Sequence, residues 1–236
     1  MGASDFLKDI KILQNEEGYR FSMDALLVYS FVNLPRLKKI ADLGAGSGVI
    51  GLLLARDYPK AAVTLIELQA GLAELAKENV ALNNLQDRVS VVRADIKHLE
   101  PTDFSFDLVV SNPPFRRPKT GKISPDDEKA AARHEIRMSL RDLTKAVSSL
   151  LRHHGRFCVI HLPERLAEII TAMRGDDMEP KRIRFVHSFA DGDAKMVLIE
   201  AVKGGRTGMK VERPLVIYTP DGGYTDEMKA MYGKLS

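Results

Sequence analysis

The sequence of 236 residues contains one cysteine and no tryptophan. Because Cys158 is alone, no disulfide can form within the chain, and we expect a reducing compartment. The apolar runs are far shorter than the ~20 residues of a membrane span, and the first residues lack the apolar core of a signal peptide. The six histidines show no spacing typical of a metal site. These absences predict a cytoplasmic protein without a membrane anchor and without a bound metal.

Charged residues make up 28% of the chain, and the net charge is +3 at pH 7. That excess is too small to indicate a nucleic-acid partner, so the placement of the charge matters more. Four cations occur with no acidic residue until position 126: Arg116, Arg117, Lys119 and Lys122. Loops are often charged simply because they are solvated, but such a cluster also suits contact with the phosphates of a nucleic acid.

Strand-like and helix-like segments alternate from residue 38 to residue 202. Apolar runs predict strands at 38–43, 61–68, 88–95, 106–110 and 156–162, and helical spacing predicts helices at 48–58, 71–85, 140–154 and from Pro163 to about Met173. Residues 181–189 and 194–202 predict two strands whose four-residue linker is too short for a crossover helix. The alternation therefore predicts a mostly parallel α/β sheet with helices on both faces and an antiparallel last strand.

We expect one domain over residues 1–236, with a cap segment at 1–37, a core at 38–202 and an extension at 203–236. Cys158 lies between apolar residues of a predicted strand and should belong to the core. His153 and His154 are expected to end the helix at 140–154, where the helix dipole favours cations.

Three glycines, Gly44, Gly46 and Gly48, lie between the first predicted strand and the first helix. Glycines there allow a tight turn and the close approach of a ligand to the backbone, at the carboxyl ends of the strands where ligands of such sheets bind. Glu67 ends the next strand, where it can accept hydrogen bonds from ribose hydroxyls. Asp95 ends the third strand, where it can hold an adenine amino group.

The same turn also satisfies a dinucleotide pattern, because Gly46, Gly48 and Gly51 have the spacing G-x-G-x-x-G and an acid follows about 20 residues later. On this motif alone an NAD enzyme is open, and so is a glycine turn without a ligand. Asp42 argues against NAD, since a carboxylate beside the glycines would repel a pyrophosphate but could pair with a cationic amino-acid ligand.

The tetrapeptide Asn112-Pro113-Pro114-Phe115 follows the strand at 106–110. Two prolines stiffen the chain and remove two backbone donors. The Asn112 side-chain oxygen and the Pro113 carbonyl could each accept one N–H of an amine on a flat ring, without reorganisation during the reaction. Phe115 could stack on that ring. A double-proline turn with Phe115 in the core is the structural alternative.

The stretch Asp42-Leu43-Gly44-Ala45-Gly46-Ser47-Gly48, with the acids at 67 and 95 and the tetrapeptide at 112–115, resembles the S-adenosylmethionine-dependent methyltransferases of the Rossmann-like class. The resemblance covers about residues 38–202. It implies a class I sheet of seven strands with the last one antiparallel, and S-adenosylmethionine held by Asp42, Gly44, Gly46, Gly48, Glu67, Asp95 and Asn112. In that class the tetrapeptide marks methylation of adenine N6, guanine N2, cytosine N4 or glutamine nitrogens.

Residues 18–27, GYRFSMDALL, closely resemble the amino-terminal signature of bacterial methyltransferases that modify adenine N6 in valine tRNA beside the anticodon. The same residues would also suit a packing helix capped by Ser22. Residues 131–135 and 217–228 resemble later signatures of that group. The resemblance implies that 16–28, with Tyr19 and Asp24, helps to cover the cofactor, and that the substrate is adenine 37 of valine tRNA. His134 is a candidate substrate contact.

Three other interpretations stay open. A ribosomal-RNA guanine-N2 enzyme would share the tetrapeptide but usually has a duplicated amino-terminal half. A release-factor glutamine enzyme more often has Tyr at position 115 and a helical domain before residue 38, for which 37 residues are too few. A non-enzymatic RNA chaperone or scaffold that binds the cofactor would be expected to lose Asn112 or Asp42.

Overall fold

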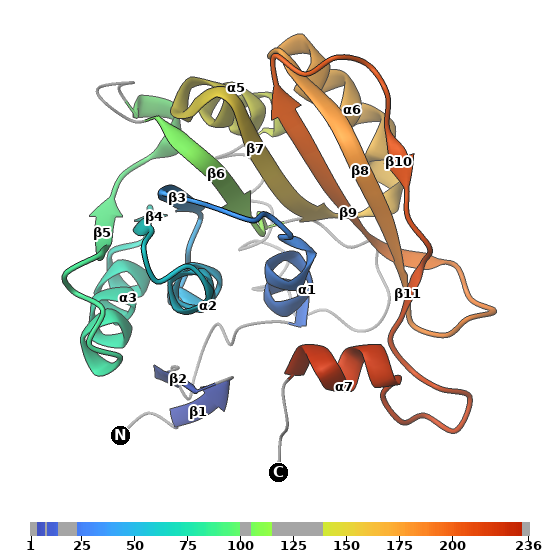
Figure 1. The fold of residues 1–236 in the computed structure, drawn as a ribbon, viewed down its shortest axis with the longest axis horizontal. Coiled ribbons are helices and arrows are strands. Elements are labelled where there is room, and N and C mark those ends of the chain that lie inside the picture. Colours follow the sequence, from blue (N-terminus) through green and yellow to red (C-terminus); the bar gives the residue numbers. More distant parts are fainter. Residues whose placement is uncertain (1–3, 8, 14–22, 100–104, 115–138, 233–236) are drawn as a thin grey trace, which may run out of the picture.

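The computed structural model describes residues 4–7, 9–13, 23–99, 105–114 and 139–232. Its centre is a sheet in the order β10-β8-β9-β7-β6-β3-β4-β5, with β11 paired to β8 (Figure 1). The seven main strands are β3 (Lys39–Leu43), β4 (Ala62–Glu67), β5 (Val89–Arg93), β6 (Phe106–Ser111), β7 (Leu151–His161), β8 (Met178–His187) and β9 (Ala194–Lys203). The sequence-based prediction of the α/β sheet is confirmed. No helix within the described residues is long and apolar enough to cross a membrane.

The predicted hairpin is β8 and β9, which pair antiparallel from Met178 opposite Lys203 to His187 opposite Ala194. Strand β9 also pairs antiparallel with β7, whereas β3, β4, β5, β6 and β7 are mutually parallel. It follows that β8 runs in the same direction as β3 and β6. Their carboxyl ends therefore share one edge of the sheet, called the carboxyl edge below.

Helices cover both faces of the sheet, as predicted (Figure 1). One face carries α1 (Met23–Phe31), α2 (Val49–Asp57) and α3 (Ala70–Leu82), and the other carries α5 (Leu140–Leu150) and α6 (Leu166–Gly175). Short 3₁₀ turns stand at Ile96–His98 and Pro163–Arg165. Both faces are buried, which explains the nearly continuous apolar strands. Cys158 is fully buried in this core, as expected.

The helix predicted at 140–154 is wrong at its carboxyl end, because α5 stops at Leu150 and β7 begins at Leu151. Leu151 is buried and pairs with Phe106 of β6. The Lys203 ammonium also donates to the carbonyls of Ser148 and Leu151, at 2.5 and 3.0 Å, and so satisfies groups at the helix end. His153 and His154 consequently lie in a strand and not at a helix end.

Five further elements lie outside the alternating core and were not predicted in detail. The amino-terminal strands β1 (Ser4–Leu7) and β2 (Ile10–Leu13) form a separate hairpin, and the extension contains β10 (Lys210–Val211), β11 (Leu215–Val216) and α7 (Asp226–Tyr232). Figure 1 shows that the hairpin and α7 lie beyond the layer of α1 to α3. Strands of two residues leave no periodicity in a sequence, so only the structure reveals them.

Candidate methyl-donor and acceptor site

The glycine turn between β3 and α2 needs its glycines. Gly44, Gly46 and Gly48 have φ values of +70°, +56° and +89°, which other residues rarely adopt. A Cβ atom on Gly48 would stand 2.9 Å from a methyl group of Leu65, whereas a Cβ on the exposed Gly44 would meet no atom within 4 Å. The turn is thus packed on its inner side and leaves open space at Gly44, where a ligand can approach the backbone.

Glu67, at the end of β4, holds the turn with its carboxylate. Its two oxygens accept hydrogen bonds from the backbone N–H groups of Gly46 and Gln69, both at 2.8 Å. The side chain is buried, and each oxygen keeps a lone pair for another donor. This arrangement suits the ribose contact predicted from the sequence, which stays a prediction.

Asp42, in β3, is completely buried below the same turn. Its Oδ2 accepts from the backbone N–H of Gly51 at 2.9 Å, but its Oδ1 has no hydrogen-bond partner among the described residues. The pKa of Asp42 is raised to about 7, chiefly by burial; the Gly51 N–H lowers it, and the nearby charge of Glu67 raises it. A buried carboxylate oxygen without a donor fits a cationic ligand, so the residues present agree with the amino-acid end of S-adenosylmethionine.

Asp95 follows β5 and is half-buried. Its Oδ1 accepts from the backbone N–H of Lys97 at 3.0 Å and caps the following 3₁₀ turn. Asp24, predicted to contact the cofactor, is buried in the first turn of α1, which confirms a helix there. The assigned contacts of both acids with a cofactor stay predictions.

Residues Asn112, Pro113 and Pro114, called the proline corner below, leave the sheet beside the glycine turn. Leu43 of β3 and Ser111 of β6 are register partners, and the Ser111 hydroxyl donates to the Leu43 carbonyl at 2.8 Å. Gly44 and Asn112 are the next residues of their strands, which lie about 4.8 Å apart. The Asn112 side chain is half-buried and makes no hydrogen bond with any described residue. Within the described part of the chain, its amide is therefore available to a ligand next to the turn.

Pro113 is buried and Pro114 is exposed. The other predicted site residues lie outside the described residues. They are Tyr19, Phe115, Arg116, Arg117, Lys119, Lys122 and His134. The predicted stacking and phosphate contacts therefore stay predictions.

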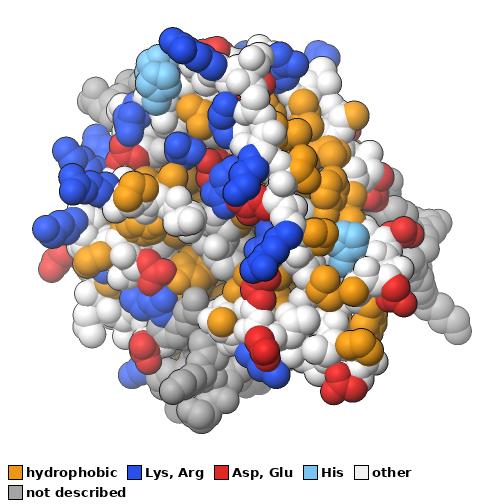
Figure 2. Space-filling view, turned by 45° about the vertical axis from the view of Figure 1, so that its right-hand side comes forward, with side chains coloured by type: hydrophobic (Ala, Val, Ile, Leu, Met, Phe, Trp, Pro, Cys, Tyr) orange, Lys and Arg blue, Asp and Glu red, His pale blue; other side chains and the backbone are white. Residues whose placement is uncertain are grey.

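A cavity of about 470 Å³ lies at the opposite edge of the sheet, and none of the predicted cofactor residues lines it. Its lining contains the cations Arg156, Lys181 and Arg206, together with His154. Figure 2, which looks toward β8 and β10, shows Lys and Arg side chains over the upper and central part of this face. The site is assigned to the carboxyl edge because the acids and glycines gather there. Among the described residues, no cluster of His, Cys, Asp or Glu could hold a metal ion.

Sequence reasoning missed Asn79, a fully buried residue of α3. Its side-chain amide donates to the Ser47 carbonyl within the glycine turn at 3.0 Å. A signal was present, since Asn79 and Asn83 stand four residues apart and so share one helix face.

Comparison with known proteins identifies the family of the chain. The model of the family "Methyltransferase small domain" matches residues 23–155. A tRNA1(Val) (adenine(37)-N6)-methyltransferase of Aeromonas hydrophila is 31% identical over 206 residues, covering 86% of this chain and 84% of that protein. A protein of the same name from Bacteroides thetaiotaomicron is 31% identical over 163 residues, covering 68% of this chain and 67% of that protein.

Solved structures are also similar. The crystal structure of a predicted O-methyltransferase, protein Atu636 from Agrobacterium tumefaciens, has a TM-score of 0.72 and 28% identity, over 89% of this chain and 95% of that one. TYW2 from P. horikoshii, in complex with MeSAdo, has a TM-score of 0.59 over 86% of this chain and 72% of that one, and its 17% identity shows the fold alone. The chain belongs to the methyltransferase small domain family and to that of the proteins named tRNA1(Val) (adenine(37)-N6)-methyltransferases, and it is an S-adenosylmethionine-dependent methyltransferase.

Proposed function

We propose that this methyltransferase modifies the N6 amine of adenine 37 in the anticodon loop of a valine tRNA. The relatives from Aeromonas hydrophila and Bacteroides thetaiotaomicron carry that activity in their names. The observation in this chain that supports it most is the position of the Asn112 amide, one residue past the Leu43–Ser111 pair and beside the open side of Gly44. This amide makes no hydrogen bond with any of the described residues. A polar acceptor thus stands next to the turn that suits the methyl donor.

The residues that would hold S-adenosylmethionine surround that turn. Asp42 offers its unpartnered Oδ1 to the ammonium group, Glu67 offers its remaining lone pairs to the ribose, and Asp95 offers its second oxygen to the adenine amine. The backbone at Gly44 allows close approach. When bound, S-adenosylmethionine supplies a methyl group on a positively charged sulfur.

The corner acts on the acceptor amine. The Asn112 side-chain oxygen and the Pro113 carbonyl each accept one N–H, which turns the nitrogen lone pair toward the methyl group. As the bond from nitrogen to carbon forms and the bond from sulfur to carbon breaks, the nitrogen becomes positively charged. Its proton is then acidic enough to leave to water, so the corner needs no strong base.

This chemistry favours nitrogen over oxygen as the acceptor atom. A hydroxyl has to lose a proton before it attacks, and a base or a metal usually removes it. Among the described residues that follow β6, namely 112–114, there is no basic side chain. The corner therefore suits an amine, although the similar Atu636 structure is titled a predicted O-methyltransferase.

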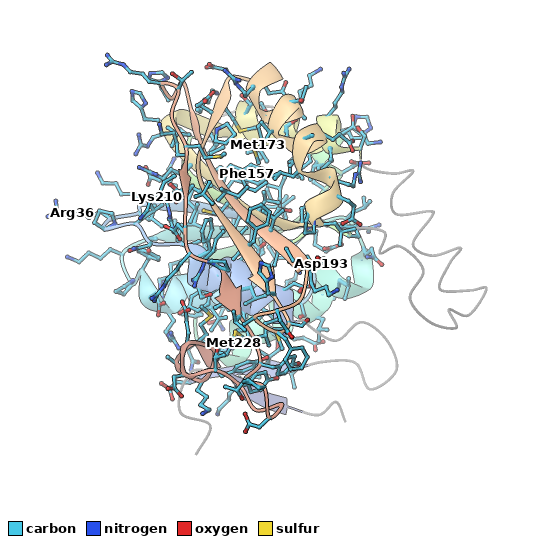
Figure 3. All side chains as sticks on the ribbon, turned by 90° about the vertical axis from the view of Figure 1, so that its right-hand side faces the viewer. Arg36, Phe157, Met173, Asp193, Lys210 and Met228 are labelled. Atoms are coloured by element: carbon cyan, nitrogen blue, oxygen red, sulfur yellow. The ribbon has the colours of Figure 1, made fainter. Side chains whose placement is uncertain are left out.

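A row of aromatic rings supports an RNA substrate. Phe189 follows β8 at the carboxyl edge, and its ring centroid lies 5.5 Å from that of Tyr218; the row continues through Tyr224 and Tyr232 with spacings of 5.4 and 5.2 Å. Phe189 is 41% exposed and Tyr224 is 36% exposed. In Figure 3, the label Asp193 marks the turn that also contains Phe189. This turn lies on the opposite side of the view from Arg36, which precedes β3. Unpaired RNA bases stack on such rings.

The loop cations Arg116, Arg117, Lys119 and Lys122 complete the proposal as phosphate contacts. In a folded stem-loop the target base would have to be flipped out or already unstacked before the corner could hold it. The predicted cytoplasmic location fits a tRNA substrate and stays a prediction.

The test separates the possible acceptor classes. The protein is incubated with labelled S-adenosylmethionine and, in separate reactions, with total tRNA, ribosomal RNA and release factor. We expect label in tRNA, recovered as N6-methyladenosine after digestion to nucleosides. Label found only as N2-methylguanosine in ribosomal RNA, or only as methylglutamine in release factor, would replace the proposal with one of the two other enzyme classes. Absence of label from every sample would contradict the proposed substrate.

A further inference from the structure

The amino-terminal hairpin is held against α3 without belonging to the main sheet. The side chains of Ile10 and Ile12 are buried in the core below α2 and α3. Among the described residues, the backbone of β2 nevertheless has no neighbouring strand on the side that faces α3. Its peptide groups at Lys11 and Leu13 bond to side chains of that helix instead.

Two asparagines of α3 make the hydrogen bonds to β2 that a neighbouring strand would otherwise make. Asn79 accepts from the Leu13 N–H at 2.7 Å and donates to the Leu13 carbonyl at 3.2 Å. Asn83 makes the same pair of bonds with Lys11, at 2.9 and 2.8 Å. Four residues of a helix rise about 6 Å, and two residues of a strand span about 6.8 Å. Because these lengths nearly match, two side-chain amides can each bond one peptide unit of β2.

Asn79 differs from Asn83 in one contact. Its Nδ2 also donates to the Ser47 carbonyl at 3.0 Å, within the glycine turn, where Ser47 is buried. The neighbouring Gly46 donates in turn to Glu67. The second donor bond of Asn83 goes to the Asn79 carbonyl of its own helix. One buried amide therefore joins the hairpin to the turn that faces the methyl donor, and losing it would leave a buried carbonyl unpaired.

We propose that Asn79 is a positioning residue for the methyl donor, which couples docking of the amino-terminal hairpin to the conformation of the glycine turn. A ligand that favours the ordered turn then favours the docked hairpin, and docking strengthens ligand binding by the same factor. The inference concerns the donor site and holds for any acceptor, so its test uses no RNA and is independent of the proposed substrate.

The test compares Asn79→Ala with Asn83→Ala, which removes the same kind of hairpin contact but leaves the turn untouched. We expect Asn79→Ala to raise the dissociation constant of S-adenosylhomocysteine about tenfold by calorimetry, the usual scale of such coupling. Asn83→Ala should raise it less than about threefold while speeding hydrogen exchange at the Lys11 amide. In turnover assays, Asn79→Ala should raise KM for S-adenosylmethionine and leave kcat within about twofold.

Wild-type protein provides a second readout in case Asn79→Ala fails to fold. S-adenosylhomocysteine should slow hydrogen exchange at the Leu13 amide, whose N–H donates to the Asn79 side chain. Unchanged exchange at Leu13 on ligand binding would overturn the proposal. Equal effects of the two substitutions on ligand affinity would also overturn it, because they would show that hairpin stability alone is responsible.

Discussion

The two halves of the carboxyl edge are built differently. In the donor half, around β3 and β4, the polar groups are held by backbone partners: Glu67 by Gly46 and Gln69, and Asp42 by Gly51. In the acceptor half, beyond β6 and β8, the Asn112 amide has no partner among the described residues, and the rings of Phe189 and Tyr224 are partly exposed. The polar groups of the donor half are therefore fixed before any ligand binds. The acceptor half instead has an amide without a hydrogen-bond partner among the described residues and two partly exposed rings.

This difference has a physical consequence. Preorganised groups lose little free energy on binding because they need not be ordered first, so the donor half should govern affinity for S-adenosylmethionine. A free acceptor placed beside the reacting atom acts chiefly when charge develops there. The acceptor half should therefore govern turnover and the choice of substrate. Substitutions in the two halves ought to separate these effects.

The largest expected effect is that of Asn112→Ala on turnover. Losing one preorganised polar contact to the reacting amine should lower kcat by ~10²–10³. The melting temperature should hardly change, because the Asn112 side chain makes no hydrogen bond within the described fold. Affinity for S-adenosylhomocysteine should fall far less than kcat, although Asn112 is also a predicted cofactor contact. Asn112→Asp keeps the oxygen acceptors and should retain more activity than Asn112→Ala. Full activity of Asn112→Ala on RNA would show that the corner does not hold the amine.

Glu67→Ala tests the donor half. It removes the predicted ribose acceptor and the anchor of the Gly46 N–H together. Calorimetry should show S-adenosylhomocysteine binding weakened by on the order of 1.5–3 kcal/mol, the scale of charged hydrogen bonds. Asp87→Ala, which removes an exposed carboxylate between α3 and β5, serves as the control and should leave binding unchanged. Micromolar binding of NAD by wild-type protein with no response to S-adenosylhomocysteine would contradict the donor assignment.

Asp42 makes the donor half sensitive to pH. Its pKa is raised from 3.8 to about 7 by burial, so the native chain keeps this proton at pH values where the unfolded chain has lost it. The contribution of Asp42 to the free energy of unfolding therefore falls as the pH rises from about 4 to about 7, and is constant above that.

A ligand ammonium beside Oδ1 favours the ionised form of Asp42. Binding of S-adenosylhomocysteine at pH 7 should then release about half a proton.

Calorimetry in two buffers of different ionisation enthalpy measures that proton. In Asp42→Asn the release should disappear, and affinity should no longer rise between about pH 6 and about pH 7.5. A binding enthalpy of the wild-type protein that is the same in both buffers would show that Asp42 does not meet the ligand cation.

The smallest effects are expected on the substrate surface. Phe189→Leu keeps an apolar side chain but removes a stacking face, so KM for the anticodon stem-loop should rise about three- to tenfold with an unchanged salt dependence.

Replacing Arg116, Arg117, Lys119 and Lys122 with Ala should instead flatten the salt dependence of RNA binding, by ~0.7–0.9 in slope per lost contact. An unaltered slope would mean that the loop is only solvated surface. An unaltered KM for Phe189→Leu would remove the aromatic row from the substrate face.

The sequence predicted the donor half better than the acceptor half. Strands β3 to β5 are short apolar runs that end in glycines or acids, so their positions and the acids at 42, 67 and 95 could be inferred from local pattern. The hairpin of β8 and β9 followed from a linker too short for a helix. The role of Asn112 rested on its position after a strand and on a family resemblance.

What could not be predicted depends on long-range contacts. The end of α5 is set by Lys203, about 50 residues along the chain, which bonds the Ser148 and Leu151 carbonyls. The docking of β2 depends on two asparagines more than 60 residues away. The rings of Phe189 and Tyr232 join one row only because the extension folds back on strand β8. No window of local sequence contains these pairs.

The central claim is that the acceptor half holds the N6 amine of one anticodon-loop adenine. The most direct measurement is mass spectrometry of nucleosides from an unmodified valine tRNA anticodon stem-loop after reaction with S-adenosylmethionine. A second stem-loop with guanine in place of adenine 37 is treated in parallel. The account predicts N6-methyladenosine from the first stem-loop and no methylated nucleoside from the second. N2-methylguanosine from either stem-loop, or N6-methyladenosine from the second, would contradict it.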